Sequence, residues 1–219
     1  WFQTALGDKD EWVRSCAIEA LGNAAAHLDK ENIPTIFWFQ EDYQVRSSAI
    51  KALGNAAAHY DKENIPTILG CFQSALSDKD KEMRSSAIKA LGNTAAHYDK
   101  ENIPTILSWF QTALGDKDKD VRSWAIDALG NAAAHIGKEN IPTILSWFQT
   151  ALGDKDSGVR SSAILILNKE VAALVDKETI PIILSWFQTA LGDKDEWVRS
   201  FAIEALGNTA AHYDKENIP

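Results

Sequence analysis

The sequence has 219 residues, of which 45% are hydrophobic and 24% are charged, and its formal net charge is −9. This charge argues against a nucleic-acid-binding protein, because phosphate binding uses clustered Lys and Arg side chains. The sequence shows no secretory signal and no Asn-x-Ser/Thr sequon, and no apolar run approaches the roughly 18 residues that span a bilayer.

Six copies of one 38-residue unit fill the chain. In each copy an Ile-Pro pair lies downstream of a Val-Arg or Met-Arg pair. A fixed period of this size is typical of an α-solenoid, a tandem repeat in which each unit buries its apolar face against its neighbours. We therefore expect a single array over residues 1–219, with units of approximately 1–33, 34–65, 66–103, 104–141, 142–180 and 181–219. The prolines are Pro34, Pro66, Pro104, Pro142, Pro181 and Pro219.

The fourth unit predicts a helical hairpin. Pro104 suits the first turn of a helix, where its missing N–H costs nothing, and Gly115 suits the end of that helix. Asp118 is placed to cap a second helix that should run to about His135. The first helix has an apolar stripe at spacings of three and four: Ile106, Leu107, Phe110 and Leu114. The second helix has another: Val121, Ala125, Leu129, Ala132 and Ala133.

A glycine recurs inside the second helix, where it costs about 1 kcal/mol relative to alanine. Its recurrence in five of six units indicates that a neighbouring helix passes too closely for a Cβ atom. The five glycines are Gly22, Gly54, Gly92, Gly130 and Gly207.

The segment from Asp118 to Gly130, DKDVRSWAIDALG, resembles the second helix of HEAT repeats, most closely the short variety first named for phycobilin lyases. The resemblance recurs six times. It implies an all-α, right-handed superhelix in which first helices lie on the convex side and second helices line the concave side. It also implies a structural ladder in which a turn aspartate and a second-helix arginine bond within and between repeats.

The residues that match this ladder are present in every unit. The aspartates are Asp10, Asp42, Asp80, Asp118, Asp156 and Asp195. The arginines are Arg14, Arg46, Arg84, Arg122, Arg160 and Arg199. Six copies along a solenoid indicate a structural role rather than a catalytic one.

Three second-helix positions differ most between units, and their spacing places them on one face of the helix. That face is opposite the apolar stripe, so we expect it to form a partner-binding surface with exposed aromatic groups; packing between helices is the alternative interpretation. The predicted binding residues are Trp12, Glu19, Lys51, Lys89, Trp124, Asp127, Leu165, Trp197, Phe201 and Glu204. First-helix tryptophans recur at one position, which indicates packing between first helices: Trp1, Trp38, Trp109, Trp147 and Trp186.

No constellation of catalytic or cofactor-binding residues is apparent, so we predict no enzymatic activity, no cofactor and no metal. One histidine per repeat cannot share an ion with the next across about 10 Å. Cys16 and Cys71 fall in different repeats and in different helices of their units, so a disulfide is not expected. Two reduced thiols suit a cytoplasmic protein.

These features predict a non-enzymatic scaffold that binds a protein or peptide partner, with no nucleic-acid or membrane partner. One alternative is a HEAT protein like the phycobilin lyases. Another is a repeat region of a larger receptor or ATPase, which fits a sequence whose only methionine is Met83.

Two irregularities and the two ends carry further predictions. The second unit lacks six residues, so its first helix, about 35–40, should be short. The fifth unit has one extra residue, which should produce a bulge near Asn168. Residues 1–34 and 186–219 match at 31 of 34 positions, and each end should present apolar surface, so end-to-end self-association is expected.

Overall fold

The structure is a computed structural model that describes residues 4–5, 7–23, 43–56, 65–97, 99–171 and 179–212. All regular secondary structure in these ranges is helical, which confirms the predicted all-α class. The α-helices are α2 (Glu11–Asn23), α3 (Tyr43–Ala56), α4 (Ile65–Leu76), α5 (Lys81–Thr94), α6 (Ile103–Leu114), α7 (Lys119–Ala133), α8 (Ile141–Leu152), α9 (Ser157–Ile166), α10 (Ile180–Ala190) and α11 (Glu196–His212). The remaining turns are η6 (Ala95–His97), η7 (Lys100–Asn102), η8 (Lys138–Asn140) and η9 (Leu167–Val171).

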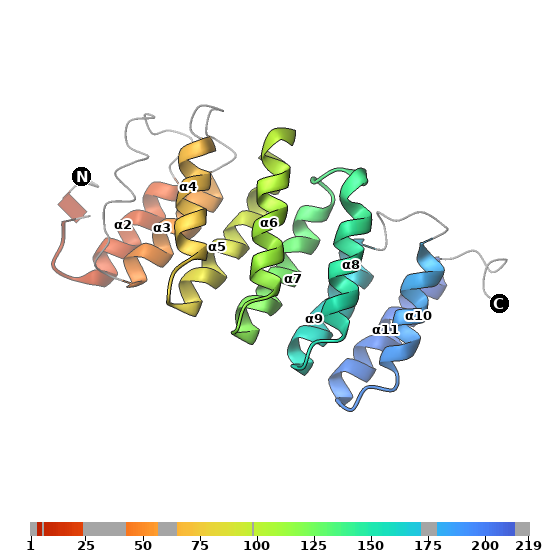
Figure 1. The fold of residues 1–219 in the computed structure, drawn as a ribbon. Coiled ribbons are helices and arrows are strands. Elements are labelled where there is room, and N and C mark those ends of the chain that lie inside the picture. The colour runs from red at the N-terminus through yellow and green to blue at the C-terminus, as the bar shows by residue number, and fades with distance from the viewer. Residues whose placement is uncertain are drawn as a thin grey trace. The chain divides into compact units, whose positions relative to one another are not determined.

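The chain divides into two compact units, Trp1–Ala113 and Leu114–Pro219. In unit 1, α3 packs between α2 and α5, and α4 packs on α5. In unit 2, α9 packs between α7 and α11, with α8 and α10 in a separate layer against them (Figure 1). Each unit is thus a row of parallel second helices backed by first helices. The boundaries of a single array over 1–219 stay a prediction.

First helices form because an Ile-Pro start is followed by apolar residues at helical spacing. In α8, proline occupies the first turn and the buried stripe comprises Ile141, Ile144, Leu145, Phe148 and Ala151. One phenylalanine in each of four first helices is completely buried: Phe72, Phe110, Phe148 and Phe187. Burying such a side chain contributes about 1.5–3 kcal/mol, so these rings anchor the first-helix layer.

Second helices begin at a capping aspartate. The carboxylates of Asp80, Asp118 and Asp156 each accept the backbone N–H two residues later. The predicted cap at Asp118 is therefore confirmed, and α7 ends at Ala133, within two residues of the expected His135. All five residues of its predicted apolar stripe are buried.

The close approach predicted at the recurring glycine is present at Gly54. A Cβ placed there would lie 2.9 Å from the Ala90 Cβ of the next second helix, closer than packed carbon atoms approach. Gly207 differs, because a Cβ there would meet nothing within 4 Å. The steric reason for glycine therefore depends on a second helix packed against it.

The fifth repeat carries the predicted bulge. Helix α9 ends at Ile166, and residues Leu167–Val171 continue as a π-helix, in which each turn accommodates one more residue. Asn168 lies inside this turn and replaces the recurring glycine. The predicted short first helix at 35–40 lies outside the described residues.

Candidate functional site

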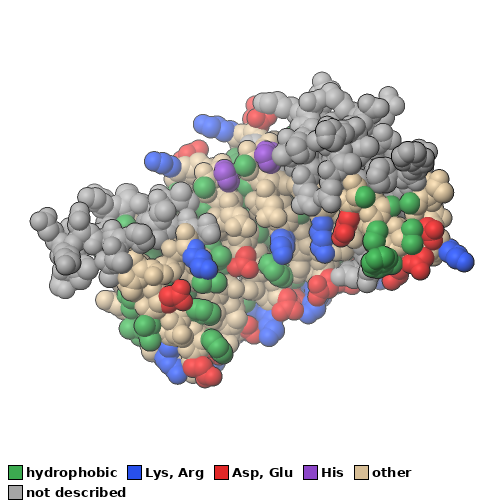
Figure 2. All heavy atoms as spheres, turned by 180° about the vertical axis from the view of Figure 1, so that it is seen from behind, with side chains coloured by type: hydrophobic (Ala, Val, Ile, Leu, Met, Phe, Trp, Pro, Cys, Tyr) green, Lys and Arg blue, Asp and Glu red, His purple; other side chains and the backbone are tan. Residues whose placement is uncertain are grey.

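The candidate site is the outward side of the second helices, here called the second-helix face. It comprises the predicted residues Trp12 and Glu19 (α2), Lys51 (α3), Lys89 (α5), Trp124 and Asp127 (α7), Leu165 (α9), and Trp197, Phe201 and Glu204 (α11). The view from behind shows hydrophobic side chains interspersed with acidic and basic ones on the surface (Figure 2).

Three tryptophans of this face are exposed, as the sequence predicts. The exposed fraction is 69% for Trp12, 65% for Trp197 and 38% for Trp124. Phe201 and Leu165 are half-buried, so part of each side chain packs against the helix layer. Exposure makes these groups available to a partner; their role in binding stays a prediction.

Helix α11 carries an aromatic pair on this face. The rings of Trp197 and Phe201 lie one helical turn apart with centroids 6.5 Å from each other and planes tilted by 35°. Glu196 and Glu204 are exposed on the same helix. The cap is formed by Asp195, which accepts the backbone N–H of Trp197 and so fixes the start of the helix. The result is an aromatic pair with acidic neighbours on a rigid element.

The corresponding positions in unit 1 are more polar. Lys51 and Lys89 occupy the third variable position of α3 and α5, and both are exposed. Cys16, which aligns with Phe201, is an exposed free thiol. Trp12 therefore has no aromatic neighbour one turn later on its helix.

Three arginines of the predicted ladder, Arg46, Arg122 and Arg160, bond an aspartate of the next repeat, but this aspartate is not the one predicted. Arg122 bonds both carboxylate oxygens of Asp154, at 2.7 and 2.8 Å. Arg160 does the same with Asp193, at 2.7 Å for each bond. Arg46 reaches Asp78 through a single 2.6 Å bond from Nη1. Each partner lies two residues before the aspartate expected from the resemblance.

The physical reason for this correction is helix capping. The expected aspartates accept the backbone N–H two residues later, which directs their carboxylates at their own helix: Asp10, Asp80, Asp118, Asp156 and Asp195. Asp156 also pairs with Lys119 at 3.4 Å. Asp42 lies outside the described residues.

The same arginines hold their own turn. Nη1 of Arg14, Arg122 and Arg199 donates to a backbone carbonyl six residues earlier, at 2.7–2.9 Å. Arg84 and Arg160 make the same bond. One guanidinium thus fixes the turn between helices and, where it meets the next repeat's carboxylate, joins two repeats.

The ion pairs shift the acidity of the aspartates. The Arg160 guanidinium lowers the pKa of Asp193 below its usual value, against an opposing effect of burial. Burial raises the pKa of Asp154 and Asp78, but hydrogen bonds from the paired arginine and from the backbone outweigh it, so both values lie below the usual range. All three carboxylates are therefore charged at neutral pH and belong to the scaffold.

Two features were not predicted from the sequence, although the first leaves a signal in it. Serine hydroxyls join neighbouring second helices, Ser47 with Ser86 at 3.0 Å and Ser123 with Ser162 at 2.7 Å. Ile203 is 63% exposed, although its equivalents in other repeats are buried. The recurrence of serine in the aligned repeats was the available signal for the first feature.

The first-helix tryptophans within the described ranges, Trp109, Trp147 and Trp186, are half-buried, which agrees with a packing role. Trp1 and Trp38 lie outside those ranges. Burial raises the pKa of the Cys71 thiol to about 11, which makes it a weak nucleophile at neutral pH.

Among the described residues, no three His, Cys, Asp or Glu side chains lie close enough together to hold a metal ion. In the same part of the chain, no helix combines the length and apolar character needed to cross a bilayer.

Comparison with known proteins identifies the repeat type. Residues 4–162 match the family model described as "Stalled ribosome sensor GCN1, HEAT repeats". No curated protein matches the chain in sequence. The match spans more than half of the chain; the finer resemblance to the phycobilin-lyase variety stays an expectation.

Solved structures with the same fold include natural and designed proteins. Cex1p superposes with a TM-score of 0.77 at 21% identity, over 93% of this chain and 40% of its own. An engineered protein of the Northeast Structural Genomics Consortium gives 0.55 at 22%, over 96% and 95%. A designed armadillo repeat protein in complex with the peptide (KR)4 gives 0.54 at 19%, over 94% and 97%. At these identities the likeness concerns the fold alone, and it confirms a helical repeat of the HEAT and armadillo type.

Proposed function

Because this chain belongs to the HEAT-repeat family, whose repeats stack into extended surfaces, we propose that it is a non-enzymatic scaffold that binds a protein partner through its second-helix face. The observation that carries the proposal is the exposed aromatic pair on α11, Trp197 with Phe201. Large aromatic groups on a solvated, rigid helix are the side chains that most often dominate binding energy.

The charge around this pair favours a basic peptide as the bound segment. Glu196 and Glu204 flank the two rings on α11, and the whole chain carries a net charge of −9. Lys and Arg side chains pair with carboxylates and also stack on tryptophan faces. The armadillo neighbour whose structure contains the (KR)4 peptide is an example of such a ligand on a related fold.

A labelled (KR)4 peptide and an acidic peptide of equal length provide the test, with binding followed by fluorescence polarisation. We expect binding of the basic peptide alone, and a loss of about 10-fold or more in affinity in the Trp197→Ala variant. Ile182→Ala is the matched control, because Ile182 is also an exposed apolar residue, at 50%, but lies on first helix α10. Equal binding of both peptides, or no effect of Trp197→Ala, contradicts the proposal.

The alternative function, a phycobilin-lyase-like role, makes a different prediction. A protein of that kind purified from cells that make bilins would carry bound pigment and absorb visible light. A colourless protein that binds the basic peptide favours the scaffold. Free thiols at Cys16 and Cys71 support a reducing compartment, and we propose a cytoplasmic location on that ground.

A further inference from the structure

The first helices differ from the second helices in carrying no charged residue. Helices α4, α6, α8 and α10 have 12, 12, 12 and 11 residues and contain no Asp, Glu, Lys or Arg. Across the whole chain 24% of the residues are charged, and each described second helix carries at least one of them. Charge is therefore absent from one helical layer of each unit.

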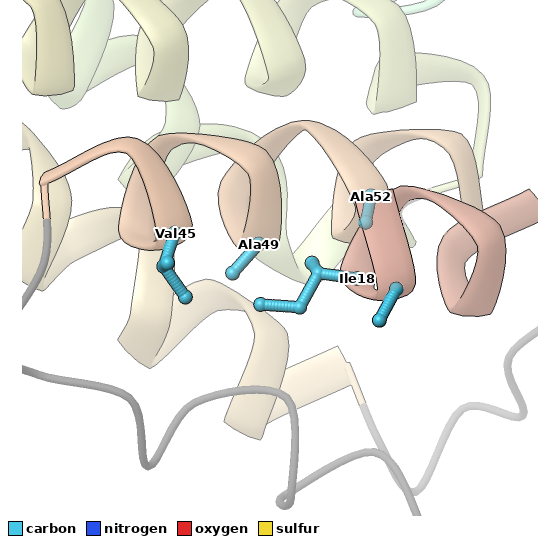
Figure 3. Packing of buried hydrophobic residues seen from close by; sticks show 5 residues of the cluster. Ile18, Val45, Ala49 and Ala52 are labelled. Atoms are coloured by element: carbon cyan, nitrogen blue, oxygen red, sulfur yellow. The ribbon is translucent and has the colours of Figure 1, made fainter. Parts of the chain in front are cut away.

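The inner side of the helical layers is already covered within the molecule. In α8, the side that carries Ile144 and Phe148 is completely buried. Neighbouring second helices meet at joints of buried apolar residues, and Figure 3 shows the one between α2 and α3: Ile18, Val45, Ala49 and Ala52. The apolar stripes are thus used for packing inside the molecule, and the opposite side of the first helices remains exposed.

This exposed side of the first helices is here called the outer face. In α8 it comprises five exposed, uncharged residues: Pro142, Thr143, Ser146, Gln149 and Thr150. Helix α6 repeats these residue types, and α10 has Ile182 in place of the threonine at 143. Trp147 is half-buried and lies four residues after Thr143 and three before Thr150, so the exposed part of its ring adjoins the outer face.

The hydroxyl groups of the outer face have already used their donors. Ser146 Oγ donates to the Thr143 carbonyl at 2.7 Å, and Thr150 Oγ1 donates to the Ser146 carbonyl at 2.9 Å. The same bonds occur in α6 and α10: Ser108, Thr112, Ser185 and Thr189. Because a donor that bonds inside its own helix needs no water, covering this face leaves few hydroxyl donors unsatisfied.

Helix α10 adds an exposed apolar residue to the outer face. Ile182 is 50% exposed, and it lies one turn before the half-buried Trp186. The equivalent residues in the other first helices are exposed as well: Thr67, Thr105 and Thr143. Exposure at this position is therefore common to all four first helices. In unit 2, α8 and α10 contact each other, so their outer faces adjoin.

We propose that the outer face binds the outer face of a second copy of this chain. Two copies that each carry a net charge of −9 repel one another on average. The outer face lets them touch without placing carboxylates against carboxylates. The buried centre of an interface is typically depleted of charged residues and enriched in aromatic ones, as this face is. A covering surface must be equally free of charge, and a second copy supplies one through two-fold symmetry.

Such a contact closes at two copies, because the same patch meets itself. It uses first helices only, so each copy keeps its second-helix face for a partner. The dimer is therefore independent of the function proposed above, and it would present two partner-binding surfaces at once.

Sedimentation velocity over a range of protein concentrations tests the proposal. We expect a mass that rises from one chain and stops at two. Thr143→Glu and Ile182→Glu should each weaken the dimer by about 10-fold or more, because each would bury a carboxylate without a partner. Thr143→Gln has nearly the size of Thr143→Glu but no charge, so it should keep the dimer. One chain at every concentration, growth beyond two chains, or a Thr143→Glu dimer as tight as wild type overturns the proposal.

Asn131→Glu is the control for added charge, because Asn131 is an exposed, uncharged residue of second helix α7. It should leave the dimer unchanged, whereas a loss equal to that in Thr143→Glu would mean that total charge, rather than the outer face, sets the association. Circular dichroism on every variant confirms that the helices are kept.

Salt provides a test that needs no variant. The distance over which charges act shrinks from about 10 Å at 0.1 M salt to about 3 Å at 1 M. An uncharged contact between two acidic chains should therefore tighten as salt is added. Weakening by salt would show that ion pairs hold the copies together and would contradict the proposal. Wild-type protein that stays a single chain in solution but binds neutral phosphatidylcholine vesicles would assign the outer face to a membrane instead.

Discussion

The two units use the same arginine at the same place in the repeat, but the joints that it makes differ. In unit 2, Arg122 and Arg160 each donate two hydrogen bonds to the carboxylate of an aspartate, and their side chains are 6% and 7% exposed. In unit 1, Arg46 makes one bond to Asp78, is 29% exposed, and keeps a buried Nε with no hydrogen-bond partner. A bidentate pair fixes direction as well as distance, so the joints at Arg122 and Arg160 should be stronger than the joint at Arg46.

The second-helix faces of the two units also differ, because unit 2 carries more aromatic side chains. At the first two variable positions unit 2 presents Trp124, Trp197 and Phe201, and unit 1 presents Trp12. At the third variable position α3 and α5 of unit 1 carry Lys51 and Lys89. Surface residues in a repeat are under little packing constraint, so they diverge while the buried stripe stays constant. Unit 2 therefore combines two bidentate arginine–aspartate pairs with the aromatic pair on α11.

The largest effect should come from removing one of the firm joints. Arg160→Ala leaves the Asp193 carboxylate and a turn carbonyl without their donor in a nearly buried site, and we expect a loss of about 3 kcal/mol. Arg46→Ala removes a single bond at a more exposed side chain and should cost about 1 kcal/mol. Urea unfolding followed by circular dichroism measures both. Equal losses of unfolding free energy in Arg160→Ala and Arg46→Ala would contradict the distinction between the two kinds of joint.

Acid should weaken the same joint. Asp193→Asn should cost about 2 kcal/mol at neutral pH, because the wild-type carboxylate accepts charge-assisted bonds from Arg160. The Arg160 guanidinium lowers the folded-state pKa of Asp193, so its contribution is complete above the unfolded value of about 3.9 and is lost as the pH falls through the folded-state value. The difference between wild type and variant should therefore shrink below about pH 4.

Asp78→Asn in unit 1 serves as the comparison for this titration. Burial opposes the charged form of Asp78 more than any other influence, and Arg46 offers only one bond. We expect Asp78→Asn to lower the free energy of unfolding at neutral pH by less than Asp193→Asn does. A larger or pH-independent difference would show that the single bond is as strong as the paired ones.

Period and pattern in the sequence were enough to predict the helical hairpins, the Asp118 cap, the close approach at Gly54 and the bulge around Asn168. These features depend on the local spacing of residues, which can be compared between the six repeats. The partner predicted for the ladder arginine was wrong, because in five of the six turns two aspartates lie two residues apart and only three-dimensional capping geometry tells them apart.

A smaller effect, with opposite signs in the two units, should follow from adding one methyl group. Gly54→Ala places a Cβ 2.9 Å from Ala90 in unit 1, and the overpacking should cost about 1–2 kcal/mol. Gly207→Ala in unit 2 meets nothing within 4 Å and should gain up to about 1 kcal/mol from helix propensity. Thermal unfolding at low protein concentration, where assembly does not contribute, gives both values. A gain at Gly54 would mean that the helices separate easily at that joint.

The smallest effects on stability should come from the exposed tryptophans, and they connect stability to binding. Trp12 is 69% exposed and has Cys16 one turn later, so Trp12→Ala should change the free energy of unfolding by less than about 0.5 kcal/mol. Trp197 is 65% exposed but lies against Phe201, so Trp197→Ala should cost about 0.5–1 kcal/mol. The two variants should differ much more in peptide affinity. The loss of affinity in Trp197→Ala should far exceed that in Trp12→Ala, because among the described second helices only α11 offers two rings with acidic neighbours. Urea unfolding and fluorescence polarisation on the same two variants make the comparison. If Trp12→Ala weakens the (KR)4 peptide as much as Trp197→Ala does, the binding surface is not concentrated in unit 2, and the contrast between the units concerns their joints alone.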